Sequence, residues 1–411
     1  MKQPAPLLLV YPNCGLDTNP TLNLLLERLA DRRVETDVLL YEGEGFRTPN
    51  AYGETIHLQQ LPGEWFFDYQ WASLRSMPMR MLRKVLFPWR YPGYSVSRDL
   101  ALFKLMRARR YGAILGVDPY GIILADMLNQ RAHRPLIYLS FELMFMEEVL
   151  HTEEEFLKYL ELAACERISL ALIQDEERGE VFGRENGVAW DKLVFVPAAP
   201  PPRDVPKSNR LRRILGIPPK KRIVLYCGNL ESWASRDDFE EMVSYWPEEF
   251  CLVLHLAAEP SAMLARHMKQ LTGTGRVFLS DEPVGRDELL DLVASADFGL
   301  APFKPVPDRW WAGNNLYHLG LSSGKVSYYA LCGLPILARS LPVFDREFAE
   351  FRGGKVYHRL AETGALLKEM DRQYARYSAE SRRFYDERLD PSSGMDDFCH
   401  RLFDLTRQGG D

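Results

Sequence analysis

Residues 320–338 read GLSSGKVSYYALCGLPILA, a cluster of small polar residues, a helix-like apolar segment and a turn into a strand-like run. The unpaired N–H groups of a first helical turn lie at the positive end of the helix dipole, so a helix start can hold an anion. Ser322 and Ser323 can cap this turn. Gly324 lets a ligand approach the backbone, and Lys325 adds a full positive charge. The stretch therefore predicts a helix between strands, with either a diphosphate site or an ordinary cap beside a solvated lysine.

The same alternation of strands and helices extends in both directions. Short apolar runs typical of buried strands lie at 5–12, 34–41, 111–121, 134–142 and 168–178, and again at 222–230, 249–257, 276–282 and 297–303. Helical segments such as 21–32 and 287–296 separate them, which predicts parallel sheets wound by right-handed crossovers. The proline-rich residues 196–207 interrupt the pattern and predict a hinge.

These boundaries predict an α/β protein with two Rossmann-type doubly wound domains that face a cleft. Residues 1–200 form the first domain, 201–375 the second, and 376–411 C-terminal helices that cross back towards the first domain. An insertion at about 62–95 is dense in aromatic and basic residues. It predicts either aromatic packing on the first domain or a patch that contacts anionic membranes.

Composition excludes several classes of function. A chain of 411 residues with 46% hydrophobic residues has room for two cores. The net charge of −6 argues against nucleic-acid binding. Six scattered cysteines without a CxxC pair indicate reduced thiols, a cytoplasmic protein and no zinc site. No apolar run approaches the length of a membrane span, so membrane contact would be peripheral, at the inner face of the membrane.

Familiar phosphate loops are missing. The sequence has no GxxxxGK[ST], and TGTGR at 272–276 lacks the third glycine of GxGxxG. ATPase and dehydrogenase functions lose support for this reason. In a doubly wound domain, ligands bind where the carboxyl ends of the strands meet helix starts. The candidate loops include 11–20, 116–121, 139–145 and 173–178 in the first domain.

Two motifs, and the spacing between them, resemble those of a known protein family. VASADFGLAPF (293–303) and YALCGLPILA (329–338), preceded by LYCGNL (225–230), are similar to the second domain of nucleotide-sugar glycosyltransferases with the GT-B fold, of the retaining group 1 type. The resemblance covers most of 222–340 by motif and the first half by topology. It implies two facing Rossmann-like domains, a nucleotide-diphosphate sugar as donor substrate, and neither cofactor nor metal.

The resemblance also assigns donor-binding positions. They are Gly15, Gly228, Arg236, Glu282, Pro283, Ser322, Ser323, Gly324 and Tyr328. The chain departs from the pattern in two ways. Gly320 and Tyr328 stand where many members carry two glutamates, and Arg236 alone replaces a basic pair. A divergent member is therefore expected, whose nucleotide and sugar stay open, with Tyr328 as a candidate for a hydrogen bond to the ribose.

Candidate residues for the acceptor side come mainly from the first domain. Glu142 stands at the end of the strand-like run 134–142 among Phe and Met residues, a setting that raises the pKa of a carboxyl group and suits a general base. A structural carboxylate is the alternative. Asn13 and Asn19 are candidates for acceptor or sugar binding or are turn residues. Asn314 and Asn315 are candidates for sugar binding or for stabilising their loop.

The resemblance, together with these residues, implies a glycosyltransferase that moves a sugar from a nucleotide-diphosphate donor to a hydroxyl acceptor. Glu142 and Lys325 are the catalytic candidates, with Lys325 stabilising the departing diphosphate. The predicted partners are a nucleotide sugar and a carbohydrate or glycolipid acceptor of surface polysaccharide or glycolipid assembly. The resemblance of the second domain to retaining members implies retention of stereochemistry, whereas Glu142 as base favours inversion. A sugar-nucleotide epimerase of this fold and a non-catalytic GT-B-like binding protein are the alternatives.

Overall fold

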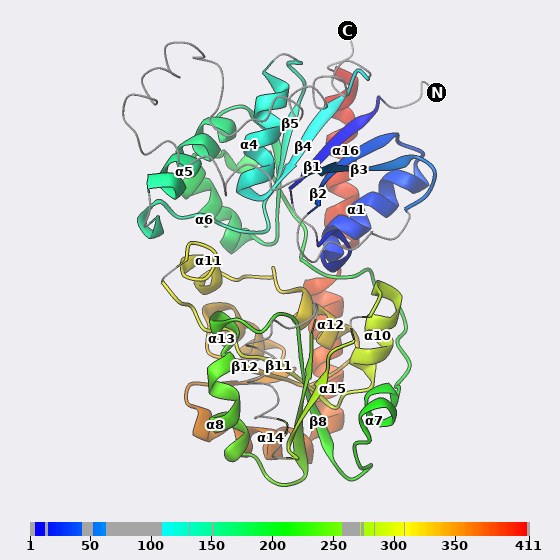
Figure 1. Ribbon diagram of the computed structural model, residues 1–411, viewed down its shortest axis with the longest axis vertical. Coiled ribbons are helices and arrows are strands. Elements are labelled where there is room, and N and C mark those ends of the chain that lie inside the picture. The colour runs from blue at the N-terminus through cyan, green and yellow to red at the C-terminus, as the bar shows by residue number, and fades with distance from the viewer. Residues whose placement is uncertain are drawn as a thin grey trace.

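The computed structural model describes residues 5–12, 15–42, 52–62, 109–130, 132–149, 152–256, 272, 275–282, 284–307 and 309–408. Two α/β domains lie one above the other, with the C-terminal helices running along both (Figure 1). Asn13, Pro283 and the insertion from residue 63 onward lie outside the described residues, so the predictions made for them stay predictions.

The first domain has one parallel sheet, in the order β3-β2-β1-β4-β5-β6-β7. The strands are β1 (Leu7–Tyr11), β2 (Thr36–Glu42), β3 (Ile56–Pro62), β4 (Ala113–Val117), β5 (Leu136–Leu139), β6 (Ile168–Ile173) and β7 (Leu193–Phe195). The helices described here are α1 (Pro20–Asp31), α4 (Asp118–Asn129), α5 (Thr152–Cys165) and α6 (Glu176–Asn186), with the short η1 (Leu16–Thr18), η3 (Met146–Glu148) and η4 (Trp190–Lys192).

The second domain repeats this design in the order β10-β9-β8-β11-β12-β13, again all parallel. Its strands are β8 (Arg222–Cys227), β9 (Phe250–His255), β10 (Val277–Ser280), β11 (Phe298–Ala301), β12 (Ile336–Arg339) and β13 (Gly354–Tyr357). Helices that the structure describes are α7 (Arg210–Leu215), α8 (Phe239–Ser244), α10 (Arg286–Ala294), α11 (Asn314–Tyr317), α12 (Gly324–Leu331), α13 (Pro342–Glu350), α14 (Thr363–Arg372) and α15 (Tyr374–Phe384). Shorter turns are η5 (Ser232–Ala234), η6 (Arg236–Asp238), η7 (Leu360–Glu362) and the π-helical η8 (Tyr385–Leu389).

Each sheet is buried on both faces, which explains the continuous apolar runs in the sequence. Alternate residues of a strand point to opposite faces. In β1, Leu7 and Leu9 pack into the core on one face, and Leu8 and Val10 pack into the core on the other. Residues of β8 divide in the same way between the two cores of the second domain.

The last helix returns to the first domain, as the sequence predicts. α16 (Ser392–Gln408) places Met395, Phe398, Cys399 and Leu402 in the same core as β1 and α1. In Figure 1 this red helix runs beside the strands of the upper domain. The two-domain α/β architecture of the sequence analysis is confirmed.

The hinge segment 196–207 is fastened at several points. Ala198 donates its N–H to the carbonyl of Leu321 (2.9 Å) and accepts from the Ser327 hydroxyl (2.8 Å). The hydroxyl of Tyr385 donates to the carbonyl of Pro200 (2.6 Å). These bonds hold the crossing chain against α12 and the C-terminal helices.

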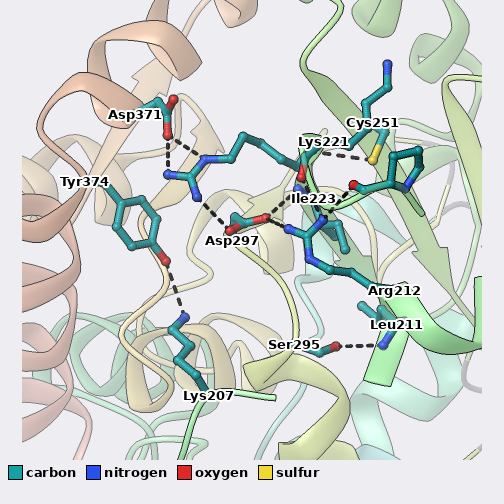
Figure 2. Close-up of polar contacts among 12 residues, drawn as sticks. Lys207, Leu211, Arg212, Lys221, Ile223, Cys251, Ser295, Asp297, Asp371 and Tyr374 are labelled. Atoms are coloured by element: carbon teal, nitrogen blue, oxygen red, sulfur yellow. Dashed lines mark hydrogen bonds and ion pairs between the residues drawn. The ribbon is translucent and has the colours of Figure 1, made fainter. Parts of the chain in front are cut away.

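The amino edge of the second sheet carries a structural ion-pair cluster (Figure 2). Asp297 accepts from Arg212 (2.7 Å) and Arg222 (3.0 Å) and from the backbone N–H of Ile223 (2.8 Å). Arg222 also pairs with Asp371, which ties α14 to the start of β8. Ligands of such folds bind at the opposite, carboxyl edge, so we assign this cluster to stability.

Candidate functional site

We give the name anion site to residues that the sequence predicts to bind an anion and that lie together at the carboxyl edge of the second sheet. They are Gly228, Ser323, Gly324 and Lys325. Ser323 is the N-cap of α12, and its hydroxyl oxygen accepts from the N–H of Val326 at 3.4 Å. The remaining N–H groups of this first turn are therefore directed beyond the helix start.

Lys325 lies in an aromatic cage that the sequence analysis did not identify. Its ammonium nitrogen is 4.2 Å from the ring centre of Tyr226, 4.8 Å from that of Phe303 and 5.6 Å from that of Trp233. It also donates to the Tyr226 hydroxyl at 3.1 Å. Within the described residues, no carboxylate lies within ion-pair distance of this ammonium. Burial lowers the pKa of Lys325 to about 7.

The turn after β8 brings backbone close to this ammonium. Gly228 has a φ of 136°, a conformation that favours glycine. A Cβ atom at this position would lie 3.3 Å from the Lys325 ammonium nitrogen. The N–H of Gly228 donates to the carbonyl of His255 at 3.0 Å, which fixes the turn to β9. Sequence and structure agree in bringing Gly228 and Lys325 together.

The start of α1 in the first domain faces the start of α12. A Cβ atom on Gly324 would lie 3.6 Å from the ring of Pro20, the first residue of α1. Asn19 caps α1, because its side-chain oxygen accepts from Thr21 (3.1 Å) and Leu22 (3.0 Å). Gly15 precedes η1 just before this cap. Both glycine turns and both helix starts thus lie along the boundary between the domains.

Three donor candidates have other surroundings. Ser322 donates its hydroxyl to the carbonyl of Leu319 at 2.7 Å. Arg236 pairs with the neighbouring Asp237 at 2.9 Å in η6. Glu282 is exposed in the loop after β10. The structure brings none of these side chains into contact with Lys325.

The two departures from the glutamate pattern have distinct structural settings. Gly320 has a φ of 52°, and a Cβ there would lie 2.1 Å from a carboxylate oxygen of Asp175, so no side chain fits at this position. Tyr328 is buried and lines a small pocket with α1, the hinge prolines Pro200 and Pro201, and Leu290. Tyr328 thus lines a pocket with the proline-rich segment, whereas Lys325 contacts Tyr226 and Phe303 at the ends of strands.

A second set of polar residues lies between the domains. We call Asp118, Glu142, Arg178 and Asn315 the interdomain cluster. Arg178 is fully buried, and it donates to the carbonyl of Phe141 in the first domain (2.7 Å) and to that of His318 in the second (2.7 Å). Asn315 accepts from the N–H of Leu143 at 2.8 Å and donates to the carboxylate of Glu142.

Asp118 supports the backbone that carries Glu142. It has a φ of 57°, which is unusual for a residue other than glycine, and it stands directly after β4. One of its carboxylate oxygens accepts from the N–H groups of Phe141 (2.7 Å) and Glu142 (2.9 Å). Burial, followed by repulsion from Glu142, raises the pKa of Asp118 to about 8. Burial also raises the pKa of Glu142.

The sequence analysis selected Glu142 and Asn315 but missed Asp118 and Arg178. Asp118 lies in the candidate loop 116–121 and Arg178 in the candidate loop 173–178, so their positions at strand ends could have identified them from the sequence. Their partners lie 23 to 140 residues away in sequence and could not be inferred from spacing.

The neighbouring loop of the second domain is fastened to the same edge. Glu148 accepts from the N–H of Asn314 at 2.7 Å, and Glu147 accepts from its side-chain amide at 2.6 Å. Trp310 enters the first domain and packs in one cluster with Ile123 and Met144. Asn314 and Asn315 therefore stabilise this loop, and Asn315 also contacts the candidate base.

Metal ligands do not cluster in the part of the chain that the structure describes: no group of three or more His, Cys, Asp or Glu is arranged there to hold a metal ion. In the same residues, no helix combines the length and apolar composition needed to cross a bilayer.

Solved structures with the same architecture span the whole chain. A sucrose-phosphate synthase from Thermosynechococcus elongatus matches with a TM-score of 0.69 and 12% identity, covering 98% of this chain and 100% of that chain. The HepE protein of Anabaena, in complex with UDP and glucose, matches with a TM-score of 0.66 and 13% identity, covering 97% and 99%. An alpha,alpha-trehalose 6-phosphate synthase from Burkholderia multivorans matches with a TM-score of 0.60 and 12% identity, covering 99% and 100%. No protein-family model matches the sequence, and no curated protein matches it either.

Proposed function

Because the chain has the GT-B fold of these nucleotide-sugar enzymes, we propose that it transfers a glycosyl group from a nucleotide-diphosphate sugar to a hydroxyl acceptor. The donor binds at the anion site of the second domain. The acceptor binds beside Glu142, on the first domain. Transfer takes place at the boundary where the two helix starts face each other.

One observation carries this proposal. The ammonium of Lys325 is enclosed by aromatic rings and has no carboxylate partner among the described residues, although it adjoins a glycine turn and a helix start. A buried cation without a counterion is costly unless a ligand supplies the charge. A diphosphate supplies it, and the free N–H groups of α12 add hydrogen bonds.

The proposed mechanism assigns one role to each catalytic residue. The bond between the sugar anomeric carbon and the diphosphate oxygen breaks, and a bond to the acceptor oxygen forms. The acceptor proton moves to the carboxylate of Glu142. Negative charge grows on the departing diphosphate, where Lys325 and the start of α12 stabilise it. Glu142 as base makes the reaction inverting.

Similar structures favour particular substrates within this proposal. The structures of HepE are complexes with UDP or UDP-glucose, which favours a uridine nucleotide here. WaaG, another similar structure, is a glycosyltransferase involved in lipopolysaccharide biosynthesis, which favours a glycolipid or surface polysaccharide acceptor. Transfer without a metal is part of the same proposal. Contact with an anionic membrane depends on residues outside the described part and stays a prediction.

A panel of nucleoside diphosphates and nucleotide sugars tests the function. Thermal shift and calorimetry measure binding, and nucleotide release with and without acceptors measures turnover. Stabilisation by UDP together with acceptor-dependent release supports a transferase. Binding with interconversion of the sugar would indicate an epimerase, and binding without turnover a binding protein. If no nucleotide binds, the proposal fails.

Glu142→Gln should abolish transfer while leaving the donor bound. The amide retains an oxygen that can accept from Asn315 but cannot take a proton, so we expect kcat to fall by about 10²- to 10⁴-fold. Calorimetry should show UDP affinity within about twofold of the wild type. Glu180→Gln, at an exposed position of α6, is the matched control and should leave kcat unchanged. A Glu142→Gln enzyme of normal kcat would remove the base assignment.

UDP affinity should decline as the pH rises above 7. The pKa of Lys325 in the free protein is about 7, and only the protonated form pairs with the diphosphate. Affinity should therefore fall by up to about tenfold for each pH unit above 7. The terminal phosphate loses its second proton near pH 6, so its own charge hardly changes in this range. Calorimetry at pH 7, 8 and 9 measures the effect, and a guanidinium in Lys325→Arg should flatten it. A flat wild-type profile would contradict the assignment.

A further inference from the structure

Trp311 is an exposed tryptophan at the boundary between the domains. It is 36% exposed, whereas the adjacent Trp310 is 4% exposed because it is buried in the first domain. The two rings are almost perpendicular, at 87°. The loop therefore uses one tryptophan to anchor itself and presents the other to solvent.

Asn315 joins Trp311 to the candidate base. Its side-chain nitrogen donates to the backbone carbonyl of Trp311 at 3.1 Å and also to the carboxylate of Glu142. The carbonyl oxygen of Trp311 and the carboxylate of Glu142 both bond to this nitrogen, so they lie within about 6 Å of each other. The residue that carries the exposed ring is thus held next to the carboxylate that is proposed to receive the acceptor proton.

The ring itself is held in place. The guanidinium carbon of Arg309 lies 5.3 Å from the ring centre of Trp311, and Trp310 contacts it edge to face at 5.5 Å. Its loop is tied to the first domain through Asn314 and Glu148. A fixed, exposed aromatic face loses little conformational entropy when a ligand stacks on it.

We infer that Trp311 is the platform on which a pyranose ring of a carbohydrate acceptor stacks, with the reacting hydroxyl directed at Glu142. This inference rests on the proposed function and adds the residue that binds the acceptor and the part of the acceptor that it binds. A pyranose has a face of C–H groups that packs on the negative face of an aromatic ring, while its hydroxyls bond to polar neighbours. Glu142 supplies such a neighbour from the first domain. A simple lipid alcohol has no such face.

The test uses the full chain saturated with UDP and a panel of methyl α- and β-glycosides of glucose, galactose, mannose and N-acetylglucosamine. Saturation-transfer NMR and calorimetry measure binding. At least one glycoside should bind the wild type. Trp311→Ala should weaken that binding at least tenfold, and Trp311→Phe should recover most of it because an aromatic face remains. UDP affinity should stay unchanged in both variants.

Trp190→Ala is the matched control, because Trp190 is 50% exposed on the first domain and should not affect binding. Three results would overturn the inference. If UDP binds but no glycoside does, the inference fails and the proposed function stands. If Trp311→Ala weakens UDP instead, the ring holds the nucleobase. If neither UDP nor a glycoside binds, both the inference and the proposed function fail.

Discussion

Lys325→Met should lower the affinity for UDP by about 10- to 150-fold, which corresponds to the loss of about 1.5–3 kcal/mol for a hydrogen bond to a charged group. The methionine side chain fits among Tyr226, Phe303 and Trp233 without the charge that the diphosphate requires. Transfer should fall further, because the charge on the leaving group grows in the transition state. Calorimetry and steady-state kinetics measure both losses.

The same substitution should leave the fold as stable as the wild type or more stable. The pKa of Lys325 lies near 7 in the folded chain and near its ordinary 10.5 in the unfolded one. The unfolded chain thus binds this proton more tightly, and between these values stability rises with pH. At pH 7 the methionine removes that penalty.

If Lys325→Met binds UDP more weakly but is at least as stable as the wild type, Lys325 is a ligand-binding residue and not a structural one. Lys355 of β13 forms an ion pair with Glu369 (2.7 Å). Lys355→Met is the matched control and should leave UDP affinity unchanged. If Lys325→Met destabilised the chain and bound UDP normally, the anion site would be wrong.

Arg178→Met should destabilise the protein by about 3–5 kcal/mol, as expected when one partner of a buried ionic network is removed. The carbonyls of Phe141 and His318 would lose a buried donor. The carboxylates of Glu142 and Asp175 would lose their nearest positive charge. Urea denaturation followed by tryptophan fluorescence and circular dichroism measures the loss. The unfolding transitions followed by the two probes should also occur at different urea concentrations, because Arg178 joins the two domains.

Arg346→Met provides the control at the same boundary. Arg346 of α13 pairs with Glu177 of α6 across the domains and with its neighbour Glu347, which keeps Arg388 as a second partner (3.6 Å); the Arg346 side chain is 45% exposed. An exposed ion pair contributes only about 0.2–1 kcal/mol. We therefore expect a loss within about 1 kcal/mol and coincident transitions. Equal losses for Arg178→Met and Arg346→Met would show that burial of Arg178 does not govern the contact.

The fold follows from local patterns in the sequence. Runs such as LLLVY at β1 and IVLYC at β8 are apolar without interruption because both faces of each sheet are covered. Their alternation with helices specifies a parallel topology, and the proline-rich hinge divides it. The glycine turn at Gly228 and the helix start at Ser323 are equally local, since each depends on a few adjacent residues.

The surroundings of each charge depend on tertiary structure. Lys325 was selected for its position at a helix start, but Tyr226 and Trp233, which enclose it, come from other segments. The sequence analysis offered a capped helix with a solvated lysine as the alternative. The aromatic cage argues against that alternative because it leaves Lys325 only partly exposed and lowers its pKa.

The sequence by itself determined two wound α/β domains, the proline-rich segment between them and the capped start of α12, because these depend on periodicity and on residues a few positions apart. Only the tertiary structure decided the interdomain cluster. Asp118, Glu142, Arg178 and Asn315 are separated by up to 197 positions, from 118 to 315, and meet only when strand ends of one domain receive a loop of the other. Burial then changes what these side chains can do, since a carboxylate or a guanidinium without water must bind its neighbours.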